Sequence, residues 1–103
     1  MRHLNLTESV IVLITGEMAG SNEKFKLQIC GELAKCLLEI KNRFLHYLTE
    51  LAETNDNILE NIVDELCDGE IAYIYKLEIT VEATGETQVY IEQNEPTLEI
   101  VFV

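Results

Sequence analysis

An amphipathic helical pattern between two segments of strand character is the feature that most limits how this chain folds. In and just before residues 32–53, apolar side chains recur every seven residues, at Cys30, Leu37, Phe44 and Leu51 and at Leu33, Ile40 and Tyr47. This spacing places them on one face of a helix. Three further leucines, at positions 38, 45 and 48, make this face wider than a coiled-coil seam. The pattern therefore predicts a helix over residues 32–53 that a sheet, a second helix or another subunit must cover.

The segment before this helix has the pattern of two strands. Residues 9–15 are rich in β-branched side chains and apolar on both faces, which is typical of a central strand covered on two sides. After the turn residues 20–22, apolar and polar side chains alternate from Lys24 to Ile29. The sequence therefore predicts a hairpin over about residues 9–30. Two alternatives remain open, namely a helix over residues 7–19 and an extension of the long helix back to Ser21.

The residues after the long helix predict a second helix and three strands. Asn57 and Glu60 have the spacing of a capping box, and a periodic apolar face follows, which together indicate a helix over about residues 57–67. Three segments of alternating pattern, separated by turn residues, then predict an antiparallel meander over about residues 71–103. The order ββααβββ predicts one α+β domain, residues 1–103, with two helices packed on one face of an antiparallel sheet.

The acidic residues gather in the second half of the chain. The 103 residues include 19 acids and 7 bases, for a net charge of −12, which opposes direct binding to nucleic acid or an anionic membrane. Residues 1–43 hold six bases and five acids, whereas residues 44–103 hold the other fourteen acids and one base, Lys76. This asymmetry favours a basic partner, although acids that only keep the protein soluble would also explain a negative surface.

No motif for a catalytic, metal or cofactor site is present. The cysteines and histidines, Cys30, Cys36, Cys67, His3 and His46, lack the close spacing of a zinc site. We therefore predict no metal, no cofactor and no enzyme activity. Cys30 and Cys67 lie beside apolar positions and are expected to be buried, whereas Cys36 is expected at the surface and should be the most replaceable.

The same features predict a cytoplasmic protein outside the membrane. Three cysteines do not suit a closed disulfide framework. The apolar run at residues 10–14 is too short to cross a bilayer and follows no basic leader.

Carboxylates of the predicted sheet and second helix form the candidate partner-binding surface. They are Glu60, Asp64, Glu65, Glu78, Glu82, Glu92 and Glu99. Repeated carboxylates on a rigid surface present negative charge at spacings comparable to those of nucleic-acid phosphates. We therefore expect a small acidic protein that binds and inhibits a basic, nucleic-acid-binding partner or nuclease by blocking its nucleic-acid site. In size and charge alone, the chain is similar to anti-CRISPR and other phage anti-defence proteins, and to immunity proteins that neutralise nucleases.

The width of the long helix's apolar face predicts a homodimer. A small sheet would not cover that face completely, so a second copy is expected to contact a set of its residues. This predicted dimer interface comprises Leu37, Leu38, Phe44, Leu45 and Leu48. The alternative function is an oligomeric adaptor or chaperone-like protein that holds another chain through this apolar stripe or through an exposed strand edge.

Overall fold

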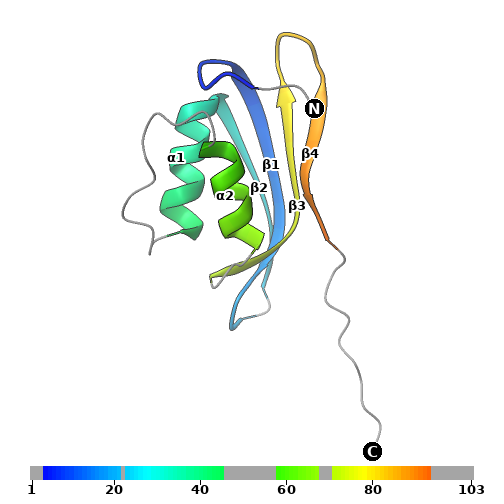
Figure 1. Cartoon of the computed structure of the whole chain (residues 1–103). Coiled ribbons are helices and arrows are strands. Elements are labelled where there is room, and N and C mark those ends of the chain that lie inside the picture. Colours follow the sequence, from blue (N-terminus) through cyan, green and yellow to red (C-terminus); the bar gives the residue numbers. More distant parts are fainter. Residues whose placement is uncertain (1–3, 22, 46–57, 68–70, 94–103) are drawn as a thin grey trace, which may run out of the picture.

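The computed structural model describes residues 4–21, 23–45, 58–67 and 71–93 of the chain. Its elements follow the order β1 (Ser9–Met18), β2 (Lys24–Glu32), α1 (Leu33–Phe44), α2 (Ile58–Cys67), β3 (Ala72–Val81) and β4 (Thr87–Glu92). The strands form one sheet, and both helices pack on the same face of it (Figure 1). The predicted α+β class, with two helices on one face of an antiparallel sheet, is confirmed.

The sheet has the strand order β2-β1-β3-β4, and every neighbouring pair is antiparallel. The hairpin of β1 and β2 agrees with the predicted one, so the two helical alternatives for this segment are wrong. Strand β1, which is rich in β-branched residues, is one of the two inner strands and is hydrogen-bonded to β2 on one side and to β3 on the other. The predicted last strand, beyond residue 93, lies outside the described residues.

The core lies between the helices and one face of the sheet. Alternate residues of β1 (Val10, Val12 and Ile14) face this core, and Val81, Ile79 and Leu77 of β3 lie directly opposite them. Because side chains opposite each other on antiparallel strands share a face, these pairs form a continuous apolar layer. The helices cover that layer with buried side chains at Leu33, Cys36, Leu37, Ile40, Phe44, Ile62 and Leu66. Each large apolar side chain buried in this way contributes about 1.5–3 kcal/mol.

Helix α1 begins directly at the end of β2, without a capping side chain. Its N-cap residue, Glu32, is extended and makes no side-chain cap hydrogen bond. Two of the first backbone N–H groups are satisfied elsewhere, because Leu33 donates to the carbonyl of Glu8 and Ala34 to that of Leu6, each at 2.9 Å. The segment before β1 therefore caps the first turn of α1 through backbone hydrogen bonds. The helix ends at Phe44, and residues 46–53 of the longer predicted helix lie outside the described residues.

Candidate interaction surfaces

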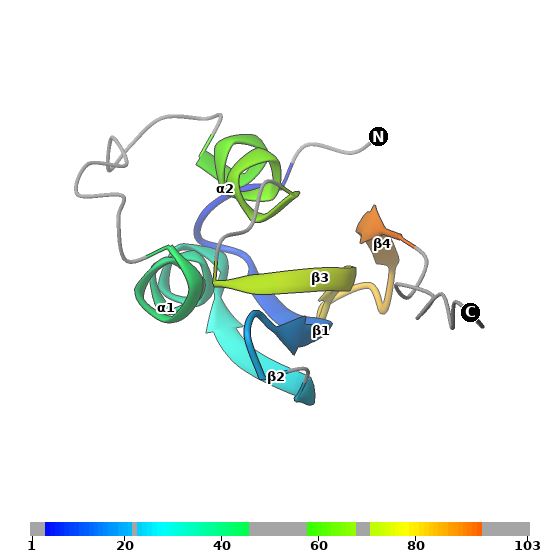
Figure 2. The same ribbon diagram turned by 90° about the horizontal axis from the view of Figure 1, so that it is seen from below.

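The sheet face opposite the helices, here called the open face, is covered by none of the described elements (Figure 2). The strand register places its residues in rows across the sheet. One row contains Gln28, Leu13, Glu78 and Val89, and the next contains Lys26, Thr15, Lys76 and Glu92. The second apolar face of β1, expected from the sequence to be covered, is therefore part of the open face.

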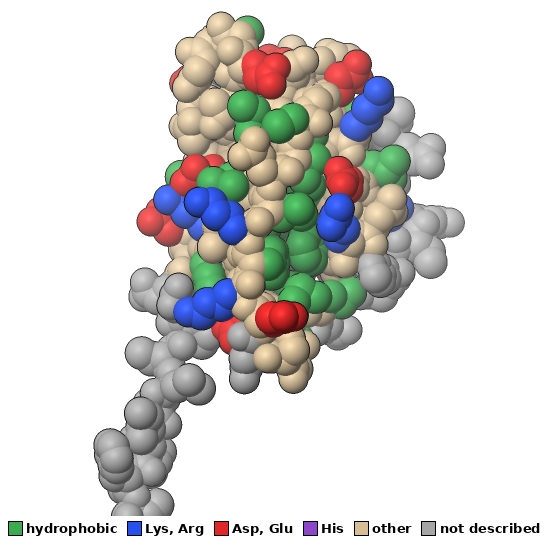
Figure 3. Space-filling model, turned by 180° about the vertical axis from the view of Figure 1, so that it is seen from behind, with side chains coloured by type: hydrophobic (Ala, Val, Ile, Leu, Met, Phe, Trp, Pro, Cys, Tyr) green, Lys and Arg blue, Asp and Glu red, His purple; other side chains and the backbone are tan. Residues whose placement is uncertain are grey.

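Apolar and aromatic side chains form a stripe on the open face, and Figure 3 shows it running between charged groups. We call it the apolar stripe. It consists of Ile11, Leu13, Tyr73, Tyr75 and Val89. Tyr73 and Val89 are 38% and 43% exposed, and Ile11 and Leu13 are half-buried. Tyr75 is 6% exposed, and Glu78 lies between Leu13 and Val89, so Tyr73 and Val89 offer most of the apolar surface of the stripe. Exposed apolar residues beside charges are typical of protein-protein interaction sites.

A β-bulge brings Tyr75 onto the open face. Thr15 lies opposite Lys76 and Gly16 lies opposite Ile74, so Tyr75 is an additional residue of β3. The Tyr75 hydroxyl donates a hydrogen bond to the Glu17 carboxylate. Its ring makes an edge contact with Tyr73, with 5.4 Å between the ring centroids. The bulge therefore holds two tyrosines together at one end of the apolar stripe.

Charged side chains border the apolar stripe unequally. In its centre, the Lys76 ammonium is 2.6 Å from a Glu78 carboxylate oxygen, and this hydrogen bond and the charge of Glu78 raise the pKa of Lys76. On one flank, β2 carries Lys24 and Lys26, whereas on the other flank β4 carries Glu92. The open face is therefore basic along β2 and acidic along β4.

The difference in charge between the β2 and β4 flanks extends to the two helices. Helix α1 contacts β2 and β1, and α2 contacts β3 and β4. The α1–β2 side carries five of the six basic residues described, namely Lys24, Lys26, Lys35, Lys41 and Arg43. On α2, β3, β4 and the turn between the two strands there are seven acids, Glu60, Asp64, Glu65, Glu78, Glu82, Glu86 and Glu92, with Lys76. The charge split along the sequence thus becomes a basic side and an acidic side.

The predicted partner-binding residues share the acidic side but not one face. Glu78 and Glu92 lie on the open face, and Glu82 lies in the turn after β3. Glu60 and Asp64 are exposed on α2, which packs on the opposite face of the sheet. Glu65 is half-buried on the same helix, and Glu99 lies outside the described residues. A flat partner surface therefore contacts either the sheet acids or the helix acids, and not both.

The predicted dimer interface on α1 is largely part of the protomer's own core. Leu37, Phe44 and Leu45 are buried, and the Phe44 ring stacks on Phe25 of β2 with 5.4 Å between centroids. Leu38 is 56% exposed, and Leu48 lies outside the described residues. Strands β1 and β2, together with α2, pack against this helix and cover most of its apolar face. Among the described members of the set, only Leu38 has most of its side chain available to a second chain.

The predicted exposures of the cysteines are wrong. Cys36 is 1% exposed, whereas Cys30 and Cys67 are exposed. Cys36 lies three residues after Leu33 and four before Ile40, and this spacing was the sequence signal that it belongs to the buried helix face. Burial raises the pKa of the Cys36 thiol, and the nearby Cys30 and Glu39 add to the effect.

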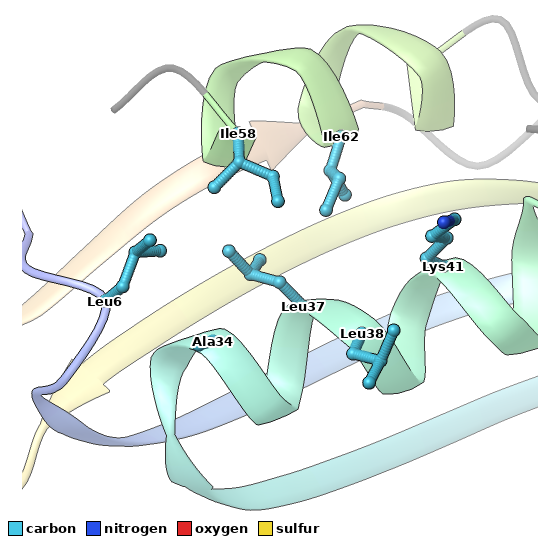
Figure 4. A pocket seen from close by; sticks show the side chains of 7 residues that line it. All are labelled: Leu6, Ala34, Leu37, Leu38, Lys41, Ile58 and Ile62. Carbon is cyan, nitrogen blue, oxygen red and sulfur yellow. The ribbon is translucent and has the colours of Figure 1, made fainter. Parts of the chain in front are cut away.

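A groove that the sequence did not predict lies between the two helices (Figure 4). Its volume is about 240 Å³, and it is lined by Leu6, Ala34, Leu37, Leu38, Lys41, Ile58 and Ile62. Six of these side chains are apolar, and Lys41 supplies one positive charge. The groove depends on the packing of α1 against α2, which apolar spacing within each helix does not specify.

Neither ligand chemistry nor similarity identifies an activity. In the part of the chain that the structure describes, no three or more His, Cys, Asp or Glu side chains are placed to hold a metal ion. None of the described helices is long and apolar enough to cross a membrane. Comparisons with protein-family models, curated proteins and solved structures give no match for this chain.

Proposed function

We propose that the protein acts by binding a basic protein through the open face of its sheet. The partner is a nucleic-acid-binding protein or nuclease. When this protein is bound, it blocks the nucleic-acid site of the partner. The observation that carries this proposal is the combination, on one uncovered sheet face, of an apolar stripe with the carboxylates of β3 and β4. The apolar stripe supplies contact area, and the carboxylates supply attraction to a positive surface.

The apolar stripe is suited to anchor a partner. Tyr73 and Val89 project from a sheet whose other face is packed against the helices, so little conformational freedom is lost when they are covered. Tyrosine is among the residues that most often dominate interface energies. Each 100 Å² of apolar surface removed from water favours binding by about 2.5 kcal/mol before the losses of association.

The carboxylates beside the stripe orient the partner. Glu92 and Glu78 lie on the β4 side of the open face, and Glu82 follows β3, while the lysines of β2 lie on the far flank. A basic partner surface is therefore attracted toward β3 and β4 and repelled from β2. Such complementarity increases the association rate and fixes the orientation more than it increases affinity.

Two charge-reversal variants test this assignment. Glu78→Lys with Glu92→Lys changes the open face, and Glu60→Lys with Asp64→Lys makes the same change in net charge on the helix face. Proteins captured by the parent from its host lysate are identified by mass spectrometry and then measured against both variants. We expect the open-face variant to lose most binding and the helix-face variant to keep most of it.

The opposite ranking, or equal losses, would contradict the assignment to the open face. Urea unfolding of both variants controls for stability, because the open-face variant also removes the carboxylate that pairs with Lys76. The captured partner should also lose its nucleic acid when the parent protein is added. A partner that keeps its nucleic acid would rule out the blocking function.

A second candidate function rests on the apolar stripe alone. Its exposed residues and the β2 and β4 edges of the sheet are suited to an adaptor that holds another chain by apolar contact or by strand addition. The two functions differ in their response to salt. Binding to a basic partner should weaken as NaCl is raised, whereas apolar binding should persist.

A further inference from the structure

The groove between α1 and α2 has one charged end. In Figure 4, Leu6 lies at one end, Lys41 at the other, and Ile58 and Ile62 point from α2 toward α1. Leu37, on α1, lies between Leu6 and Lys41. Among the described residues, the lining therefore combines an apolar trough with a single ammonium group.

Lys41 lacks an acidic partner among the described residues. Arg43 of the same helix is paired with Glu39 at 3.1 Å, and Lys76 is paired with Glu78. The positions three and four residues from Lys41 on α1 are all apolar, Leu37, Leu38, Phe44 and Leu45. In a chain with 19 acids and 7 bases, Lys41 is a half-buried residue whose neighbours on the described helix are apolar. An anionic group entering the groove would supply the missing counter-charge.

We propose that this groove binds a small amphiphile with an unbranched apolar chain and one carboxylate, as in a medium-chain fatty acid. The chain lies between Leu6, Leu37 and Ile58, and the carboxylate accepts a hydrogen bond from the Lys41 ammonium. The volume of about 240 Å³ equals that of roughly eight water molecules, which suits a ligand of about eight carbon-sized groups. Each methylene group transferred from water adds about 0.8 kcal/mol of favourable free energy.

The size and lining of the groove favour a small molecule over a protein segment. Pockets for drug-sized ligands are about 300–1,000 Å³, so this one is smaller still. A docked amphipathic helix would need apolar contacts over several of its turns. A nucleotide would need several polar groups, whereas Lys41 is the one charged side chain among the described residues of this lining. A carboxylate with a short apolar chain satisfies both ends of the groove.

Octanoate and 1-octanol are the probes for this site, because they share an eight-carbon chain and differ in charge. Binding to the full chain is followed by amide chemical shifts in NMR titrations. We expect octanoate to bind the parent more tightly than octanol and to shift the signals of Ala34, Leu38 and Ile58. Lys41→Met keeps an unbranched side chain without charge and should weaken octanoate binding about tenfold while leaving octanol unchanged.

A second pair of variants tests the location. Ala34→Leu fills the groove from an exposed helix position and should weaken both ligands, whereas Asn42→Leu adds the same side chain elsewhere on α1 and should weaken neither. Octanoate that leaves the spectrum unchanged at millimolar concentration overturns the proposal. So does an octanoate affinity that is equal in the parent and in Lys41→Met, or binding that survives Ala34→Leu. A spectrum that changes on dilution would instead show that a second copy occupies the groove.

Discussion

Burial makes Cys36 chemically different from the other two cysteines. Its Sγ lies 3.9 Å from the carbonyl oxygen of Ile29, and its raised pKa keeps the thiol protonated at neutral pH. Thiolate is the reactive form, so burial slows the reaction by lowering the fraction of thiolate and by limiting the access of the reagent. We expect a disulfide reagent to modify Cys30 and Cys67 rapidly in the folded protein and Cys36 only after urea is added. Three fast thiols in the native protein would contradict the burial of Cys36.

The same burial changes the expected effect of Cys36→Ser. From the sequence alone, this substitution was expected to be the most tolerated of the three. In the structure it places a hydroxyl among buried apolar side chains, and we expect a loss of about 1–2 kcal/mol in the free energy of unfolding. Cys30→Ser, on the exposed part of β2, should change that free energy by less than about 0.5 kcal/mol. Urea unfolding of both variants measures the difference, and equal stabilities would refute it.

Tyr90 should make the fold sensitive to alkali. Burial raises the pKa of its hydroxyl above the ordinary value of 10.0, and the charge of Glu8 adds to the shift. The unfolded chain therefore releases this proton at a lower pH than the folded chain. The corresponding stability is fully present below pH 10 and is lost as the pH rises through the folded pKa.

The test is Tyr90→Phe, whose free energy of unfolding should fall less than that of the parent as the pH is raised above 10. Tyr73→Phe, which removes a hydroxyl from the exposed side of the sheet, serves as the control. Identical pH profiles for the parent and Tyr90→Phe would contradict this role.

At the scale of elements, the bulge in β3 depends on Gly16 of the neighbouring strand. A Cβ atom at position 16 would lie 2.6 Å from the Tyr73 carbonyl oxygen and 2.9 Å from Cζ of Phe25. The carbonyl belongs to the backbone of the bulged strand and cannot move without disturbing the sheet. We expect Gly16→Ala to lower the free energy of unfolding by about 2 kcal/mol, as other overpacked sites do.

Thr15→Ala, at the neighbouring position on the open face, is the control and should have a much smaller effect. Circular dichroism with urea unfolding measures both variants. Should Gly16→Ala be as stable as the parent, the close approach at the bulge does not constrain this residue.

Period-two and period-3.6 patterns predicted most of the elements, because each reflects one buried face. They predicted β1, β2, α2 and β3 to within a few residues of their observed bounds. Cys36 was misassigned because the prediction followed positions seven residues apart, whereas Cys36 shares the buried face through its spacing of three and four residues from Leu33 and Ile40. Helix α1 was predicted to begin at residue 32 and begins at Leu33. Its capping contacts could not be predicted from side chains, because its first N–H groups bind backbone carbonyls of the segment before β1.

At the scale of the whole molecule, the sequence predicted the charge asymmetry but not the faces on which it lies. The acids of α2 and those of β3 and β4 are near in sequence and on the same side of the fold. The two groups are separated because α2 packs on one face of the sheet, while Glu78 and Glu92 project from the other. That separation depends on the pairing of strands and on helix packing, which no local pattern encodes. The open face results from the position of β1 between β2 and β3 in the sheet.

The crowding of acids on one side predicts that salt stabilises the fold. A net charge of −12 repels itself in the compact state, and seven of the described acids lie on the α2–β3–β4 side with Lys76. Raising NaCl from 0.01 M to 0.1 M shortens the screening length from roughly 30 Å to about 10 Å, which weakens this repulsion. We expect the free energy of unfolding to increase over that range. Glu60→Lys with Asp64→Lys, which replaces two exposed carboxylates with ammonium groups on the acidic side, should show a smaller increase. Stability that falls as NaCl is added would show instead that attractive pairs, such as Lys76 with Glu78, outweigh the repulsion.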